Sequence, residues 1–455
     1  MQAESYSNPF VTSPVASFRP IAQAERIETV DILRGVALLG ILMMNIPVFA
    51  MPEYFSKSFR SDTDNVNFWV DAVVTVLFEG KMRALFSMIF GVGILLFTTK
   101  KERTGKSVVG LYYRRMGWLI LFGLIDAHVL LWSGDILYLY GVCGLLAFLF
   151  RNVKPAYLAI GVPLIALIDF TSGTLFYQNM REKLLGYKEA KAAQEHHQTL
   201  TEQQKKAMTD WRAIQKEFIP NKAEVAEHTR SMKSNYTTVA NYLRPLSWDF
   251  QTKYLAYAIW DPLALMLLGM ALYKWGYFAG KWPRRRYIQI MLVGYGIGLP
   301  LVIFNYYNSY THFPNVASRL AYMETHAISW MSLIYPFQRI LLVMAHASLL
   351  ILLIQSGAAQ RFLKRLAAVG QMAFTNYVMH TVICTFIFFG YGLNYFAELQ
   401  YYQLFFIVVG IWVLQLIVSP IWLRYFQFGP LEWCWRSLTY WQRQPLRHQE
   451  TALNA

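Results

Sequence analysis

Ten long apolar runs divide this sequence of 455 residues and restrict its fold more than any other feature. A helix needs roughly 20 mainly apolar residues to cross about 30 Å of hydrocarbon, and it satisfies its own backbone hydrogen bonds there. We therefore predict an all-α, polytopic membrane helix bundle of about ten (ten to eleven) transmembrane helices. The runs lie at about 32–50, 67–98, 116–132, 136–151, 155–176, 255–278, 287–305, 332–355, 368–390 and 403–424.

The composition is also that of a membrane protein, with 55% hydrophobic and only 15% charged residues. The net charge of +15 comes from short basic clusters that fall at every second connection between the runs. This pattern indicates topology rather than a nucleic-acid partner. It places both termini on the cytoplasmic side of a bacterial inner membrane. The clusters contain Lys100, Lys101, Arg103, Lys106, Arg114, Arg115, Arg151, Lys154, Lys281, Arg284 to Arg286, Arg361, Lys364, Arg365, Arg424, Arg436, Arg443 and Arg447.

The runs and clusters divide the chain into five parts. We expect a polar cytoplasmic N-terminus at 1–26, an N-terminal membrane half at 27–176 and a C-terminal membrane half at 254–428. A cytoplasmic tail follows at 429–455. The intervening segment 177–253 is charged in both signs and contains a helix-favouring stretch from Arg181 to Lys222. Alternation places it on the periplasmic side, where we expect helices that cap the outer mouth.

The second run is too long for one perpendicular crossing and carries charged residues in its middle. Glu79, Lys81 and Arg83 surround Gly80, which would permit a break. On a continuous helix Glu79 and Arg83 are four residues apart and could pair on one face. A structural ion pair across a broken helix is one interpretation, and an acid–base role for Glu79 is the other.

Ionisable groups at membrane depth are costly unless they face a partner or water, so they are candidate functional residues. When the ten runs are placed on one depth scale, such groups gather in the outer half. We expect them to line one water-accessible cavity that opens outward. They are Glu79, Lys81, Asp126, His128, Asp135, Asp261 and Arg339.

The segment around Asp126 and His128, followed by Asp135, suggests the most specific chemistry. A histidine oriented by a carboxylate can act as a general base on an acceptor hydroxyl. His128 is therefore the first candidate for catalysis. The alternative is that His128 hydrogen-bonds a neighbouring helix and Asp135 caps the next helix.

Polar residues in two further runs could bind a ligand or join helices. Arg34, with Asp31, lies at the cytoplasmic start of the first run, where it could meet a phosphate or reach lipid headgroups. Asn376 and His380 share one face of the ninth run beside Tyr377, and interhelical contacts are the alternative there. The sequence shows no metal-ligand spacing.

Several of these segments together resemble the YeiB family of bacterial membrane proteins. The likeness spans nearly the whole chain. Its N-terminal motifs are Asp31-Ile-Leu-Arg34-Gly35 with Gly40 and Asn45, Phe78-Glu79-Gly80-Lys81-Met-Arg83, and Trp132-Ser-Gly134-Asp135. Its C-terminal motifs are Gly370-Gln-Met-Ala-Phe-Thr375-Asn376-Tyr377, Phe389-Gly390-Tyr391-Gly392, and Gly429-Pro430-Leu431-Glu432-Trp433.

The resemblance extends to the transmembrane acyltransferase superfamily, which includes the lysosomal enzyme that acetylates heparan glucosamine. It implies a ten- or eleven-helix bundle with a tunnel for acyl-CoA or acetyl-CoA, and transfer of the acyl group to a glycan or lipid-linked acceptor on the far side. The lysosomal enzyme's catalytic histidine follows its first luminal loop. The corresponding stretch 51–78 contains no histidine here, so that assignment is not carried over.

An acyltransferase is thus the leading functional hypothesis. The expected catalytic residues are His128, Asp126, Asp135 and Glu79. Residues expected to bind the donor are Arg34, Arg83, Lys81, Asn45, Asn376, Tyr377 and His380, with Asn45 and Asn376 donating to the thioester oxygen. The competing hypotheses are a proton-coupled transporter or lipid-handling protein, and a non-catalytic assembly protein. Membrane lipids are expected partners, and a homodimer is left open.

Overall fold

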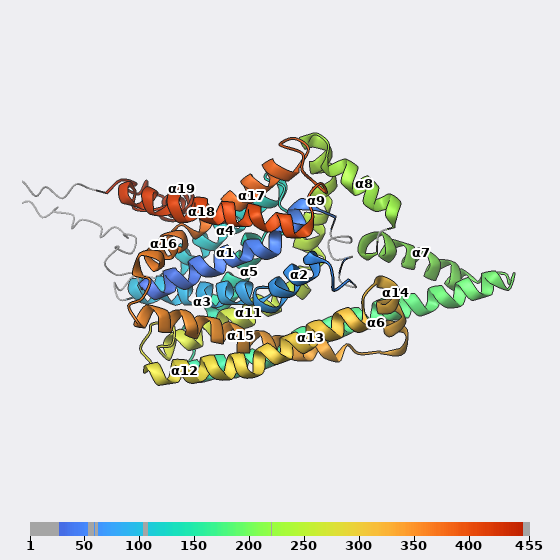
Figure 1. Ribbon diagram of the computed structural model, residues 1–455, viewed down its shortest axis with the longest axis horizontal. Helices are drawn as coiled ribbons and strands as arrows, with labels where there is room; N and C mark the ends of the chain where they lie inside the picture. The colour runs from blue at the N-terminus through green and yellow to red at the C-terminus, as the bar shows by residue number, and fades with distance from the viewer. Residues whose placement is uncertain (1–26, 53–58, 60–61, 103–107, 220, 449–455) are drawn as a thin grey trace, which may run out of the picture.

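The computed structural model describes residues 27–52, 59, 62–102, 108–219 and 221–448, and these form helices joined by loops. Most of the helices run along the long axis of the molecule (Figure 1). The predicted N-terminus 1–26 and the last residues of the predicted tail, 449–455, lie outside the described residues, as do Arg103 and Lys106. The remainder confirms the predicted all-α membrane bundle.

The helix bounds follow the predicted runs. In chain order the helices are α1 (Glu28–Ala50), α2 (Val66–Leu77), α3 (Lys81–Glu102), α4 (Val109–His128), α5 (Leu137–Ala147), the 3-10 helix η3 (Phe148–Phe150), α6 (Pro155–Glu195), α7 (Glu202–Phe218), α8 (Lys222–Met232), α9 (Tyr236–Thr252), α10 (Leu255–Ala258), α11 (Trp260–Lys274), α12 (Arg284–Val293), the π-helix η4 (Gly294–Gly298), α13 (Leu299–His312), α14 (Val316–Thr325), α15 (Trp330–Gln355), α16 (Gln360–Gln371), α17 (Ala373–Phe388), α18 (Tyr401–Tyr425) and α19 (Pro430–Tyr440).

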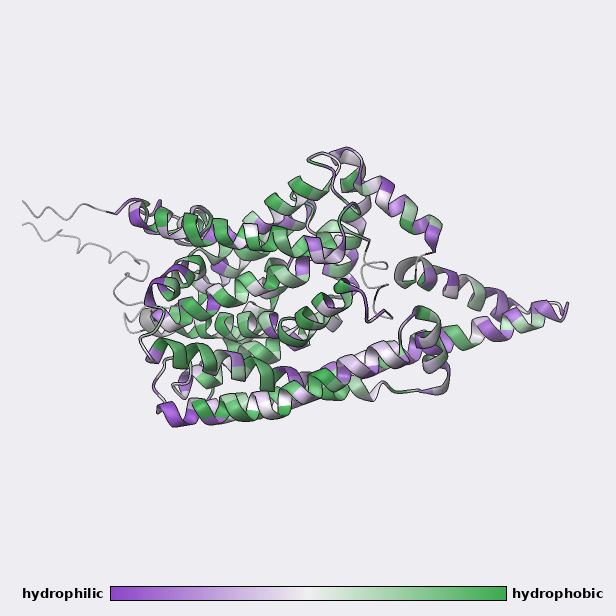
Figure 2. Ribbon diagram, in the orientation of Figure 1, coloured by the Kyte–Doolittle hydropathy of each residue, from purple (hydrophilic) through white to green (hydrophobic). Residues whose placement is uncertain are grey.

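Within the described ranges, seven helical segments are long and apolar enough to cross a membrane. They are α1, α2 with α3, α6, α10 with α11, α12 to α13, α15 and α18. Two shorter apolar segments, Leu137–Phe150 and Ala373–Phe388, lie among them. With α4, these segments account for the ten predicted runs. Figure 2 shows the hydrophobic colour over the bundle and the hydrophilic colour on α7 and α8.

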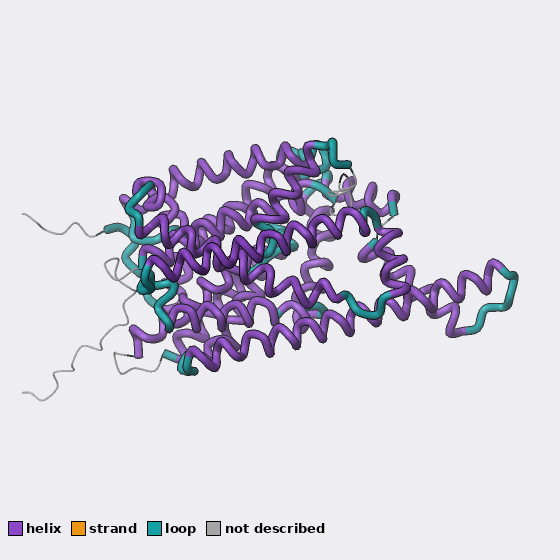
Figure 3. The backbone as a smooth tube through the Cα atoms, turned by 60° about the horizontal axis from the view of Figure 1, so that its bottom comes forward, coloured by secondary structure: helices purple, strands orange, loops and turns teal. Residues whose placement is uncertain are grey.

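The two ends of the bundle differ in charge. The "basic end" is where α1 begins and where α19 lies, at the left of Figure 1. It holds Arg151, Lys154, Arg284 to Arg286, Arg361, Lys364, Arg365 and Arg424. The "loop end" is opposite, where α7, α8, α9 and α14 lie. The tube view in Figure 3 shows the two ends of the bundle after rotation.

Among the described residues, helix breaks at Gly80 and at Met372 fall inside predicted runs, and only the first was predicted. Gly80 adopts φ +75 between α2 and α3, a left-handed conformation that disfavours side chains with a Cβ. The second break, at Met372, divides the predicted run 368–390 into α16 and α17. Glu432 of α19 caps the new helix start, accepting the Phe374 and Thr375 backbone N–H groups at 2.7 and 3.1 Å.

Paired glycines allow two helix pairs to approach closely. A Cβ on Gly35 would lie 2.2 Å from the Leu366 carbonyl oxygen, and one on Gly370 would lie 1.9 Å from that of Asp31. Gly91 of α3 and Gly269 of α11 show the same arrangement. Glycine pairs of this kind are common where membrane helices pack backbone to backbone.

The loop-end helices dock on α4. Arg244 of α9 donates from Nε to the His128 carbonyl oxygen at 2.9 Å, and the Tyr236 hydroxyl donates to that of Val129 at 2.9 Å. Helix α6 continues well beyond its predicted apolar run and carries α7 on its extension. The segment 177–253 is therefore largely helical.

Candidate functional site

Asp126 and Asp135 form a buried carboxyl pair near the loop end. Asp126 lies in the last turn of α4, and Asp135 precedes α5, where it accepts the Leu137 and Tyr138 N–H groups at 3.0 and 2.9 Å. The two carboxyl groups are close enough to interact electrostatically. Because two adjacent negative charges repel strongly in a low-dielectric interior, burial of both groups as carboxylates is costly.

The remaining contacts of Asp126 leave one oxygen unused. The Thr381 hydroxyl of α17 donates to Oδ2 at 3.3 Å. Oδ1 is buried and accepts no hydrogen bond from any described residue. A buried acceptor without a donor costs free energy, so this oxygen is suited to take a proton from a bound group.

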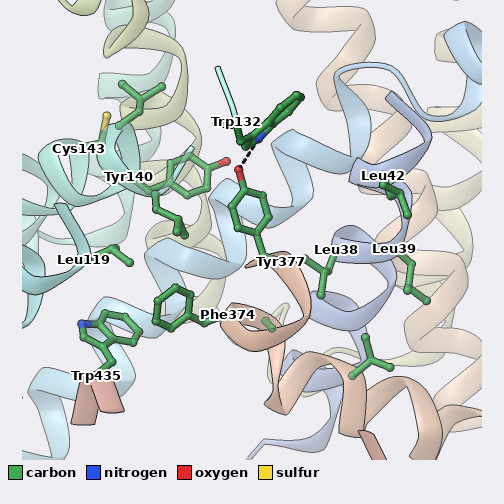
Figure 4. Close-up of a cluster of buried hydrophobic side chains, with 14 of the residues drawn as sticks. Leu38, Leu39, Leu42, Leu119, Trp132, Tyr140, Cys143, Phe374, Tyr377 and Trp435 are labelled. Carbon is green, nitrogen blue, oxygen red and sulfur yellow. Dashed lines mark hydrogen bonds between the residues drawn. The ribbon is translucent and has the colours of Figure 1, made fainter. Parts of the chain in front are cut away.

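Tyr377 lies beside this pair and joins α17 to the α4–α5 connection. Its hydroxyl oxygen accepts the Trp132 indole N–H and the Ile136 backbone N–H, both at 3.1 Å (Figure 4). Trp132 is fixed in turn by stacking on Phe49, with 3.8 Å between the ring centroids. Tyr377 also lines the cavity described next, a position that the sequence alone did not reveal, and its expected role in donor binding stays a prediction.

A cavity of about 240 Å³ extends from the basic end to Tyr377. Its lining comes from α1, α3, α4, α5, α17 and α19 and is mostly apolar. Figure 4 shows Leu119, Phe374 and Trp435 around the space below Tyr140 and Tyr377. The Tyr140 hydroxyl forms a 2.6 Å hydrogen bond with that of Ser87. The deep end of the cavity, beside Tyr140 and Tyr377, is therefore more polar than the rest of the cavity.

Three arginines line the cavity where it meets the basic end: Arg34, Arg115 and Arg436. Arg34 donates to Asp31 at 2.8 Å and to the Gly370 carbonyl at 3.3 Å. The Arg115 guanidinium lies 3.7 Å from the Trp435 ring centroid and 5.1 Å from that of Phe97. It makes no hydrogen bond or ion pair with the described part of the chain, so its N–H groups are available to an anion.

His128 lies apart from the carboxyl pair. Its Nε2 is 2.9 Å from Gln251 Oε1 of α9, which is the predicted alternative of a contact with a neighbouring helix. The expectation that Asp126 or Asp135 orients His128 is wrong. Residues two apart on an α-helix point to nearly opposite sides, so Asp126 faces α17 while His128 faces α9. The alternative for Asp135, a helix cap, is what the structure shows.

The charged residues around Gly80 form a second cluster, separate from the cavity. Glu79 lies in the turn between α2 and α3, so the expected helical spacing between Glu79 and Arg83 is absent. Arg83 instead donates to Asp261 at 3.4 Å, and Arg339 donates to the same carboxylate through both terminal nitrogens. Lys81 is buried and donates to the Thr75 carbonyl at 2.8 Å. None of the groups expected to line one outward-opening cavity lines the cavity between the basic end and Tyr377, although Asp126 and Asp135 lie beside Tyr377.

Asn376 and His380 make the interhelical contacts that were the alternative to donor binding. Asn376 donates to the Ser419 hydroxyl at 3.0 Å, and His380 Nε2 lies 3.0 Å from Gln415 Oε1 of α18. Neither lines the cavity. Asn45 is half-buried in α1 and also lies outside the cavity lining. The positions of these three residues therefore do not support the expectation that they bind a donor.

Sequence reasoning missed Arg115, Arg436 and Thr381. The two arginines were interpreted only as topology signals. Trp433 and Trp435, which are close to Arg436 in the sequence, could have suggested that a guanidinium stacks on an aromatic ring. Thr381 follows His380 directly, and helical spacing places it on the Tyr377 face. That spacing was the available signal for its contact with Asp126.

Comparison with known proteins shows which sequences this chain is similar to. Residues 272–442 match the family described as "Protein of unknown function (DUF418)". The chain is 29% identical to "Uncharacterized protein YxaH" of Bacillus subtilis (strain 168), over 95% of this chain and 98% of that protein. It is 27% identical to "Uncharacterized protein YeiB" of Escherichia coli (strain K12), over 91% and 96%. These matches support a YeiB-family protein.

This YeiB-family chain matches those relatives along nearly their whole length, so the likeness covers both membrane halves. The segment matched to DUF418 contains Tyr377 and Glu432, which define the deep end of the cavity and the start of α17. No solved structure matches this YeiB-family chain. Its cavity is therefore described from its own residues.

Proposed function

We propose that this protein is a membrane-embedded acyltransferase that takes an acyl-CoA donor into the cavity from the basic end. The observation that carries the proposal is the cavity itself, with arginines at one end and Tyr377 beside the Asp126–Asp135 pair at the other. In the bacterial inner membrane, the basic end then faces the cytoplasm, where acyl-CoA is made.

The cavity dimensions suit a linear arm better than a bulky head. Sites that enclose drug-sized ligands have volumes of about 300–1,000 Å³. A cavity of about 240 Å³ takes a pantetheine arm with its acyl chain and leaves the nucleotide outside. There the phosphates meet Arg34 and Arg115, because guanidinium groups bind phosphate oxygens through paired N–H donors.

The transfer step uses groups at the deep end. An acceptor hydroxyl, on a glycan or lipid-linked molecule at the loop end, attacks the thioester carbonyl carbon. Asp126 takes the hydroxyl proton, and Tyr377 stabilises charge on the carbonyl oxygen. The carbon–sulfur bond breaks, and the CoA sulfur takes the proton back from the carboxyl pair. The product is the acyl ester and free CoA.

Binding of octanoyl-CoA to purified full-length protein in lipid nanodiscs tests the donor site. We expect saturable binding that CoA weakens by competition, and that Arg115→Gln weakens about tenfold or more. Arg284→Gln is the matched control, since Arg284 lies at the basic end but outside the cavity. Absence of octanoyl-CoA binding at millimolar concentration would contradict the proposal.

A proton-coupled transporter is the second candidate, because both discontinuous helices lie beside buried charges. The α2–α3 break at Gly80 adjoins Lys81, and the Asp261–Arg339 pair lies at the same level. Broken helices around buried charges are typical of secondary transporters. This candidate predicts a proton-driven solute flux in proteoliposomes that Asp261→Asn abolishes and that the acyltransferase does not produce.

A further inference from the structure

The outer surface of α16 and α18 carries a groove at the basic end, separate from the cavity. It is lined by Arg361, Phe362, Arg365, Val413, Leu416 and Ile417. Phe362, Val413 and Ile417 are about half exposed and form an apolar strip, while the two arginines lie one helical turn apart above it. The groove therefore offers a cationic part and an apolar part side by side.

A proline fixes the floor of this groove. Pro420 interrupts α18 and has no backbone N–H, so the Leu416 carbonyl four residues earlier lacks its helical donor. Arg365 supplies that donor from Nη1 at 3.3 Å. The guanidinium is thereby anchored at the groove, and its other N–H groups remain exposed to the groove and the interface.

The charge around the groove is uncompensated. Neither α16 nor α18 contains an acidic residue, and none lines the groove. The position at the end of a membrane helix, beside an amphipathic basic helix, is the depth of lipid headgroups. An occupant must therefore carry negative charge at that depth and an apolar chain that extends along α18.

We infer that the groove binds an anionic phospholipid of the leaflet at the basic end. The phosphate lies between Arg361 and Arg365, and one acyl chain lies along Phe362, Val413 and Ile417. Such a lipid would hold α16 against α18 on the side opposite the Gly35–Gly370 crossing, where α16 borders the cavity. The inference is independent of the acyltransferase proposal.

Native mass spectrometry of the detergent-solubilised full chain tests this site with phosphatidylglycerol and phosphatidylcholine of equal chain length. We expect preferential phosphatidylglycerol binding that Arg361→Gln and Arg365→Gln each weaken about fivefold. Arg365→Lys, which keeps the charge, should retain most of the binding. Lys364→Gln is the matched control, because Lys364 is exposed on the same helix but does not line the groove.

Four results would overturn the inference. Equal binding of the two lipids would show that charge is not recognised, and an equal loss with Lys364→Gln would show a diffuse electrostatic effect. Displacement of phosphatidylglycerol by millimolar inorganic phosphate would identify a site for a free anion instead. Protection of the groove only in a dimer of this chain would make it a protein interface. Because Arg361 is exposed and makes no side-chain hydrogen bond or ion pair with the described residues, Arg361→Gln also separates binding from folding.

Discussion

The carboxyl groups of Asp126 and Asp135 lie side by side at the loop end, although one ends α4 and the other begins α5. Gly123 makes this approach possible, since a Cβ there would lie 2.6 Å from Asp135 Oδ2. The pair joins two roles that can be separated by mutation. Asp135 caps a helix, and Asp126 holds an oxygen that no described residue uses.

Asparagine at position 126 should remove transfer while keeping the fold. An amide has the same shape as a carboxyl group but takes no proton, so we expect Asp126→Asn to lower acyl transfer about 100-fold or more. The thermal midpoint should change little. Asp249→Asn, in the loop-end helix α9, is the control. Full transfer by Asp126→Asn would exclude Asp126 as the base.

Substitution of Asp135, which caps α5, by asparagine or by alanine should change stability by different amounts. Asparagine still accepts the N–H groups of Leu137 and Tyr138, whereas alanine does not. We expect Asp135→Ala to lower the free energy of unfolding by about 1 kcal/mol relative to Asp135→Asn. Thermal unfolding in detergent measures this difference. Equal midpoints would show that the cap adds nothing to stability.

Removal of the Tyr377 hydroxyl should destabilise the bundle. Two buried N–H donors, from Trp132 and Ile136, would lose their acceptor, which costs about 1–3 kcal/mol. Tyr377→Phe should therefore lower the thermal midpoint and change the fluorescence of Trp132. Tyr395→Phe, at an exposed position, is the control. An unchanged midpoint would mean that water replaces the hydroxyl.

Removal of the charge of only one partner of the Asp261–Arg339 pair should lower the free energy of unfolding. Arg339 is buried, and Asp261→Asn would leave its charge without the carboxylate, at a cost of about 3–5 kcal/mol. The double variant Asp261→Asn with Arg339→Met should recover much of that loss. Chemical unfolding of the unmodified protein and of these two variants tests this expectation. A double variant no better than the single one would contradict it.

Acid should loosen the loop-end helices through His228. Burial lowers the pKa of His228 in α8, which stacks on Tyr242 of α9, to about 4. Because the folded pKa is below the unfolded value near 6.5, stability is full above pH 6.5 and falls as the pH decreases toward 4. Hydrogen exchange in α8 and α9, corrected for its intrinsic pH dependence, should rise in this window. His228→Phe should flatten the response, and His196→Phe, at an exposed position, should not.

The span pattern and the first helix break could be predicted because both depend on local sequence. Apolar length marks a span, and Gly80 among charged residues marks a break. The second break could not be predicted, since Met372 and Ala373 carry no Gly or Pro signal. It depends on Glu432, which is 58 residues from Phe374 in the sequence.

The candidate site could be predicted only in part from the sequence, for a similar reason. Asp126 and His128 are neighbours in sequence, but helical geometry turns them apart, whereas Tyr377 meets Trp132 across a separation of 245 residues. Arg115 was recognised as basic, yet its place over Trp435 depends on how α19 packs on α4. Tertiary packing, rather than local spacing, decides which polar residues share the cavity.

An acyl-CoA donor bound in the cavity should place its acyl group at Tyr377. Photo-crosslinking with a diazirine at the end of an octanoyl-CoA chain tests this most directly, with labelled peptides identified by mass spectrometry. We expect labels on the α5 or α17 segments that carry Tyr140 and Tyr377, and loss of labelling with Arg115→Gln or excess CoA. Labels confined to lipid-facing helices such as α6 and α13, insensitive to CoA, would contradict it.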